Sequence, residues 1–115
     1  MKRADIEKAL VFWKTLLRLE DWRVDVFTGQ PPHKMKLDKE NLDGLNLFSP
    51  EELYSQIYLR RGATEEILVH ELLHLVFDGD KADHIYDVLH ERALNRTAEA
   101  FVKLKGATCK QNGTK

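Results

Sequence analysis

The residues with the clearest chemical potential are the five of His70-Glu71-Leu72-Leu73-His74. On a helix, two histidines four residues apart lie on one face about a turn from each other. Imidazole nitrogens at that spacing can bind one Zn²⁺, and Glu71 points into the same cleft without reaching the metal. Its carboxylate could take a proton from a water whose pKa zinc lowers toward neutrality. The spacing therefore predicts a hydrolase, provided that the segment is helical and a third ligand exists.

The residues around this motif predict a helix over 65–77. Thr64 is a suitable N-cap, and Glu65 and Glu66 place negative charge in the first turn. No Gly or Pro interrupts the segment before the stop signal at Asp78-Gly79. Most of the helix circumference is apolar, with Ile67, Leu68, Val69, Leu72, Leu73, Leu75, Val76 and Phe77. Such a helix belongs in the core, where two histidines and a glutamate are costly unless a metal compensates them.

A catalytic zinc site needs three protein ligands and an open position for water. The segment after the motif offers His84, Asp87 and Glu91, whose i, i+3, i+7 spacing puts them on one helical face. Counting back from the turn at Gly79, simple register places Asp87 nearest the level of the two histidines. A carboxylate that does not bind the metal would be expected to hold a histidine ring instead.

The run from Glu66 to Val76 resembles the active-site helix of zincin metallopeptidases. The compact layout from about Trp13 to Leu104 resembles the minimal SprT-like or gluzincin-like domains often encoded by phages and prophages. The resemblance implies a zinc-dependent peptidase with His70 and His74 as metal ligands and Glu71 as general base. Only the five-residue motif is highly specific.

The same resemblance favours Glu91 as the third ligand. Gluzincin-like families carry a helix glutamate followed by small and helix-packing residues, as in Glu91-Arg92-Ala93-Leu94-Asn95. A glutamate also has a longer reach than an aspartate. We therefore predict a zinc site of His70, His74 and Glu91, with Asp87 or His84 as alternatives to Glu91.

Hydrophobic periodicity predicts an α+β domain around the motif helix. Apolar residues at helical spacing predict an N-terminal helix over 5–19, and alternation predicts strands near 22–26, 45–47 and 54–59. Ser49-Pro50-Glu51-Glu52 has the pattern of a single helical turn. A last helix, from Lys81 to about Lys105, should fold back antiparallel on the motif helix. We thus expect one zincin-like domain over 1–105, with a small sheet of about three strands, and a flexible tail over 106–115.

Two further expectations concern the substrate. In zincins a cleft-bordering edge strand pairs with the substrate backbone, and the resemblance gives this role to the strand at 54–59. On sequence alone, an ordinary sheet strand is the equal alternative. A donor for the oxyanion is unassigned, and Tyr58 or His90 could serve.

Composition limits the remaining possibilities. The chain has 115 residues, enough for one domain, and its 18 Lys+Arg against 19 Asp+Glu make no electrostatic case for nucleic acid or an anionic membrane. The single cysteine, Cys109, excludes an internal disulfide and is compatible with a reducing compartment. No apolar run resembles a signal peptide or reaches transmembrane length. We expect a soluble, cytoplasmic monomer that acts on a peptide or protein, with no nucleic acid and no membrane as partner.

The sequence therefore predicts a zinc metallopeptidase with Zn²⁺ as cofactor. Two alternatives stay open. One is a zinc-stabilised binding module without catalysis, whose signature would be a fourth protein ligand closing the site. The other is a metal-dependent RNA hydrolase in the manner of the small YbeY-like proteins, which share paired helix histidines but lack the glutamate that stands here as Glu71.

Overall fold

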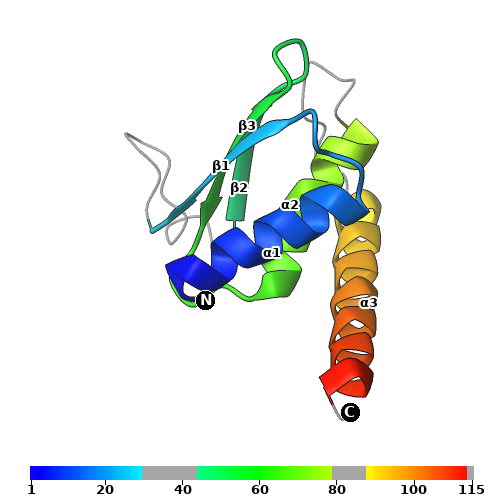
Figure 1. Cartoon of the computed structure of the whole chain (residues 1–115). Coiled ribbons are helices and arrows are strands. Elements are labelled where there is room, and N and C mark those ends of the chain that lie inside the picture. The colour runs from blue at the N-terminus through cyan, green and yellow to red at the C-terminus, as the bar shows by residue number, and fades with distance from the viewer. Residues whose placement is uncertain (30–43, 79–87, 114–115) are drawn as a thin grey trace.

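The computed structural model describes residues 1–29, 44–78 and 88–113, and within them the chain forms a small α+β domain (Figure 1). The elements in chain order are α1 (Arg3–Leu16), β1 (Arg23–Thr28), β2 (Gly44–Ser49), β3 (Tyr54–Leu59), α2 (Glu65–Asp78) and α3 (Val88–Gly113). Helix α2 packs across β2 and β3, α1 lies beside α2, and α3 packs on α2 and extends away from the sheet. No helix in these described ranges is long and apolar enough to cross a membrane.

The three strands form one sheet in the order β1-β3-β2. β3 pairs in parallel with β1 and antiparallel with β2. β2 and β3 form a hairpin whose turn occupies residues 50–53, with Leu53 at a positive φ of 50°. Within this turn the backbone N–H groups of Glu52 and Leu53 donate to the carbonyl oxygens of Ser49 and Pro50, each at 3.3 Å, so the Ser-Pro-Glu-Glu pattern marks one tight turn inside the hairpin and no separate helix.

The place of β3 in the sheet corrects one expectation. The strand at 54–59 is central, with hydrogen-bonded neighbours on both sides, so its backbone is not available to an added strand. Local alternation predicts that a strand exists but carries no information on which strands flank it. In the described part of the sheet, the edge strand in contact with α2 is β2.

The faces of the sheet follow the strand alternation. Ser55, Ile57 and Leu59 on β3 are fully buried and point toward the helices. Their cross-strand partners on β1 are Val24, Val26 and Thr28, and those on β2 are Phe48, Asn46 and Gly44. This row of mainly apolar side chains, with α1 and α2 above it, forms the core.

The helices bury the side chains that the periodicity indicates. On α1, Ile6, Ala9 and Trp13 are buried, and the Trp13 ring stacks on Phe101 of α3 at a centroid distance of 6.3 Å. Helix α2 begins directly after Thr64, as the capping pattern predicts, and its residues from Leu68 to Leu75 are buried. Val76 and Phe77 in its last turn are exposed, so the burial expected from the apolar run ends one turn early.

Helix α3 runs back along α2 in the opposite direction. Its N-terminal part meets His70 and His74, whereas Lys105 further along reaches Glu65 at the start of α2. This confirms the expected antiparallel pair. The helix continues through Gly113, beyond the boundary expected at Lys105, while its expected start at Lys81 lies outside the described residues. Flexibility of the tail over 106–115 stays a prediction.

Candidate metal centre

His70, His74 and Glu91 form a cluster at the contact between α2 and α3. Glu91 lies 2.7 Å from His70 Nε2 through Oε2 and 3.2 Å from His74 Nε2 through Oε1. One possible ligand atom from each residue lies within 4.8 Å of the others. The two imidazole rings are 5.0 Å apart between centroids and nearly perpendicular, at 74°. Local helix geometry supplies the histidine pair, and the packing of α3 supplies the carboxylate.

The donor set fits a zinc ion. Zinc prefers imidazole nitrogen and carboxylate oxygen at about 2.0–2.2 Å, which holds tetrahedral neighbours roughly 3.3–3.6 Å apart. The two nitrogen–oxygen distances of 2.7 and 3.2 Å are near this range but short enough for hydrogen bonds. The three ligand atoms lie within 4.8 Å of one another, so the side chains would have to adjust to bind one ion at these bond lengths.

Both histidines of the cluster are buried, and one of them has a ring nitrogen without a hydrogen-bond partner among the described residues. His70 and His74 are buried, with 9% and 3% of their surface exposed. The second ring nitrogen of His70, Nδ1, is buried and has no hydrogen-bond partner among the residues that the structure describes. Buried polar groups normally find partners. This nitrogen is not the one that faces Glu91, so it concerns the orientation of the His70 ring and is no evidence for a bound metal.

The Glu71 carboxylate lies beside the edge strand β2. Glu71 is buried, at 7% exposed, and a Cβ atom built on Gly44 would come within 3.0 Å of its Oε2. Asn46, two residues further along the same face of β2, donates from Nδ2 to the backbone carbonyl of Glu71 at 2.8 Å. The motif glutamate therefore meets the strand through both its main chain and its side chain.

The structure brings together three of the residues that the sequence predicts as metal ligands. His70, His74 and Glu91 come together, while Asp87 and His84, the alternatives to Glu91, lie outside the described residues. His90 approaches the cluster, with its ring centroid 5.9 Å from that of His74. The role of Glu91 as a metal ligand stays a prediction.

Tyr58 is not placed to donate to an oxyanion at this site. It pairs with Phe27 of β1, and the two rings stack at a centroid distance of 5.1 Å. Neighbouring residues of a strand alternate between faces. Because Ile57 lies in the core under the helices, Tyr58 points to the opposite face of the sheet. The expectation that it could serve is therefore wrong, and His90 is the remaining candidate.

Sequence reasoning missed Gly44, Asn46 and Ser55. Ser55 is fully buried, and its hydroxyl donates to Asn46 Oδ1 at 2.6 Å. A signal was available, because Asn46 interrupts an apolar run between Leu45 and Leu47 and asparagine is disfavoured in strands. A polar residue on the helix-facing side of a strand needs a partner, and that partner is found only in the folded chain.

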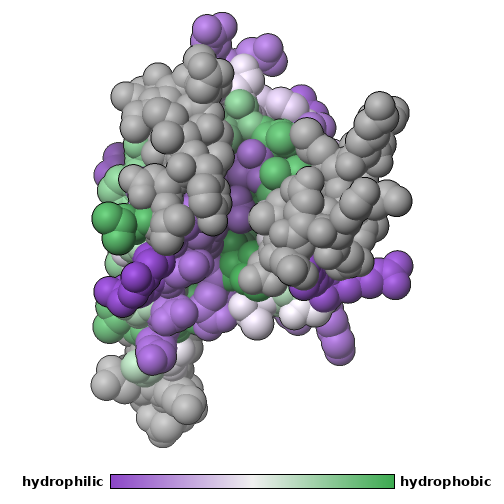
Figure 2. Space-filling view, turned by 180° about the vertical axis from the view of Figure 1, so that it is seen from behind, coloured by the Kyte–Doolittle hydropathy of each residue, from purple (hydrophilic) through white to green (hydrophobic). Residues whose placement is uncertain are grey.

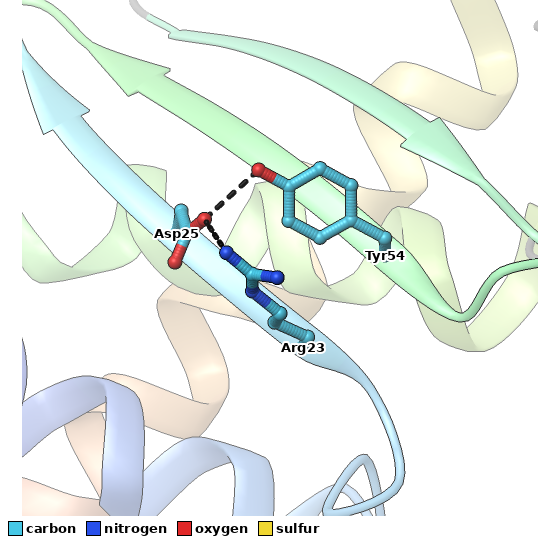
Figure 3. Close-up of polar contacts among 3 residues, drawn as sticks. All are labelled: Arg23, Asp25 and Tyr54. Atoms are coloured by element: carbon cyan, nitrogen blue, oxygen red, sulfur yellow. Dashed lines mark hydrogen bonds and ion pairs between the residues drawn. The ribbon is translucent and has the colours of Figure 1, made fainter.

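A second polar group lies on the outer face of the sheet, away from the helices (Figure 3). The Tyr54 hydroxyl donates to Asp25 Oδ2 at 2.8 Å, and Arg23 pairs with the same oxygen at 3.5 Å. The hydrogen bond to Asp25 is the main reason why the pKa of Tyr54 is raised above its ordinary value, with a smaller effect of burial. This group has no contact with the histidines and makes no case for a second site.

Comparisons with known proteins add no assignment: no protein-family model, no curated protein and no solved structure matches this chain. Function has to be argued from the residues of the cluster itself.

Proposed function

We propose that this protein is a zinc-dependent metallopeptidase of the zincin type. The observation that supports the proposal is the convergence of Glu91 on both motif histidines, with Glu71 buried one residue after His70. His70, His74 and Glu91 would hold the zinc. The bound ion would lower the pKa of a water molecule and polarise the carbonyl of the scissile bond.

The residues of the chain have separate tasks in this reaction. The Glu71 carboxylate takes the proton from the attacking water and delivers it to the leaving amine. Because Glu71 is a buried residue of α2 that lies against β2, its carboxylate works in a low-dielectric environment, where its electrostatic effect is larger than in water. His90, whose ring lies near that of His74, is the candidate to donate to the developing oxyanion.

The substrate would bind as an extended peptide along β2. This strand is at the edge of the described sheet and contacts the helix that carries Glu71. Peptide addition to an exposed strand uses main-chain hydrogen bonds, which suits a peptidase that must accept varied sequences. The space-filling view from behind shows hydrophilic surface next to hydrophobic surface in the middle of the described residues (Figure 2). Such a mixed surface suits binding of both backbone and side chains of a peptide.

One observation favours the non-catalytic alternative, a zinc-stabilised binding module. His90 lies near His74 and could close the site as a fourth ligand. Against this, the group of described residues whose ligand atoms lie close enough to share an ion consists of His70, His74 and Glu91, without His90. Three ligands would leave the open position that catalysis requires.

The decisive experiment combines zinc analysis with peptide cleavage for the wild type and Glu71→Gln. The wild type should bind about one zinc per chain and cleave unstructured peptides, because three ligands leave one coordination position open. Glu71→Gln should keep the zinc and the fold but lose cleavage, since the amide cannot accept a proton from water. Zinc binding without cleavage in the wild type would support the binding module. Wild-type turnover in Glu71→Gln would exclude Glu71 as the general base.

A further inference from the structure

A hydrogen bond joins β2 to α2 at Glu71. Asn46 donates from Nδ2 to the Glu71 carbonyl oxygen at 2.8 Å, across 25 residues of sequence. In an α-helix the same carbonyl accepts the N–H of the residue four positions later, here Leu75. A carbonyl oxygen has two lone pairs, so the asparagine can use the second without breaking the helix. The bond therefore ties the strand to the helix at no cost to helical hydrogen bonding.

The orientation of the Asn46 amide is fixed at both ends. Its Oδ1 accepts from the Ser55 hydroxyl at 2.6 Å, and Ser55 is fully buried on the central strand. A flipped amide would place its oxygen against the Glu71 carbonyl oxygen, which is repulsive, and would lose that hydrogen bond. Asn46 is thus held by β3 and in turn holds the backbone of α2 at Glu71.

Gly44 controls the space beside the Glu71 carboxylate. A Cβ at this position would lie 3.0 Å from Glu71 Oε2 and 3.3 Å from Ile67 Cγ2. The φ angle of Gly44 is not in the positive range, so alanine is permitted by the backbone. The restriction is steric: any side chain at this position would press on the carboxylate.

We propose that Asn46 and Gly44 are positioning residues for Glu71. Asn46 fixes the distance between the backbone of β2 and that of the catalytic helix, and Gly44 lets the carboxylate lie against the strand. This inference rests on the proposed peptidase function, in which β2 holds the substrate and Glu71 activates water. The general base and the peptide would then be aligned by one pair of contacts, and a misplacement of about 1 Å can cost roughly 100-fold in rate.

The test must separate positioning from ordinary support of the fold. Asn46→Ala removes the hydrogen bond to the Glu71 carbonyl oxygen, and Gly44→Ala adds a methyl group beside the Glu71 carboxylate. Val26→Ala is the matched control, because Val26 is buried on the helix-facing side of the other edge strand, away from Glu71. For each zinc-loaded variant we would measure the melting temperature, zinc content, kcat and KM, and determine the crystal structure.

Asn46→Ala and Gly44→Ala should lower kcat by roughly 10- to 100-fold, with the Glu71 carboxylate displaced relative to His70 and His74. Zinc content and KM should change little, because neither side chain belongs to the proposed ligands and β2 keeps its pairing with β3. Val26→Ala should lower the melting temperature while leaving kcat unchanged at temperatures where it is folded. If Gly44→Ala does not fold, Asn46→Ala makes the same comparison.

Two outcomes would overturn the inference. In the first, kcat in Asn46→Ala follows the melting temperature as it does in Val26→Ala. In the second, the Glu71 carboxylate keeps its place in the crystal structures of the variants. A wild type that binds zinc but cleaves no peptide would instead refute the proposed function. The crystallographic position of Glu71 in the variants would still decide whether Asn46 and Gly44 position it.

Discussion

Two carboxylates lie at the two ends of the contact between α2 and α3. They are buried to nearly the same extent but have different partners. The side chain of Glu65, at the start of α2, is 23% exposed, and that of Glu91, on α3 beside the later part of α2, is 20% exposed. Glu65 pairs with Lys105 and accepts the Trp13 indole N–H at 2.6 Å. Glu91 pairs with His70 and His74, which are charged only when protonated.

This difference distinguishes a structural ion pair from a candidate ligand site. Lysine carries a full positive charge at neutral pH, so Glu65 is compensated within the protein. The Lys105 ammonium also lies 4.5 Å from the Phe12 ring centroid, which adds a cation–π contact to the same junction. The partners of Glu91 among the described residues include two imidazoles, whose ring nitrogens can also bind a metal ion. The two ends of the α2–α3 contact therefore differ in the chemistry of their partners: an ammonium at Glu65, and two imidazoles, which are possible metal ligands, at Glu91.

The largest effect should come from removing a motif histidine. His70→Ala and His74→Ala should each weaken zinc binding by more than roughly 100-fold. That value is the upper limit expected for removing a residue that only hydrogen-bonds to a metal ligand. Competition against a chromophoric chelator measures this affinity. Glu65→Ala is the matched control at the other end of the helix and should bind zinc like the wild type. Full zinc occupancy in His70→Ala would contradict the assignment of the site.

The second largest effect compares Glu91 with Asp87 and His84, the other candidates for the third zinc ligand. Glu91→Ala should lower zinc affinity by more than Asp87→Ala or His84→Ala, because losing a direct ligand costs more than the roughly 10- to 100-fold of an outer partner. Chelator competition on the three variants decides between them. If Asp87→Ala strips the metal while Glu91→Ala keeps the affinity, the contact between Glu91 and the histidines is only a hydrogen-bonded pair.

A moderate effect on stability should come from the other end of the helix. Glu65→Ala leaves the Trp13 N–H and the Lys105 ammonium without their acceptor, which should lower the free energy of unfolding by about 1–3 kcal/mol. Glu65→Gln keeps an acceptor for Trp13 and should lose less. Chemical denaturation of the metal-free proteins measures both values. A Glu65→Ala variant as stable as the wild type would mean that Glu65 does not stabilise the fold through Trp13 and Lys105.

The smallest effect concerns Asp25, a carboxylate on the outer face of the sheet that is more exposed than Glu65 and Glu91. Its hydrogen bond raises the pKa of Tyr54 above 10.0, so Asp25→Ala should lower that pKa toward its ordinary value. A raised pKa means that the protonated phenol is favoured by folding. The contribution to stability is present below about pH 10 and is lost as pH rises through the folded-state pKa. Ultraviolet titration of Asp25→Ala against the wild type, with Tyr54→Phe to assign the transition, measures the change. An unaltered pKa in Asp25→Ala would mean that the hydrogen bond is not its cause.

The local features of this protein were predictable from its sequence. The start of α2 after Thr64, the placement of His70 and His74 on one face, and the alternation of β1 and β3 all depend on residues a few positions apart. Helical and strand periodicities are properties of the backbone over such short distances. The α+β class follows from these same patterns.

The relations between elements were decided only by the tertiary structure. Periodicity shows that 54–59 is a strand, but its central place between β1 and β2 depends on pairing between residues far apart in the chain. The count of residues after Gly79 favoured Asp87 at the level of the histidines. The structure brings Glu91 to them, because the contact depends on how α3 packs on α2, whereas Asp87 lies outside the described residues. The hydrogen bond from Asn46 to the Glu71 carbonyl oxygen was likewise decided by the tertiary structure. It joins residues 25 positions apart and exists only once the strand and the helix have packed.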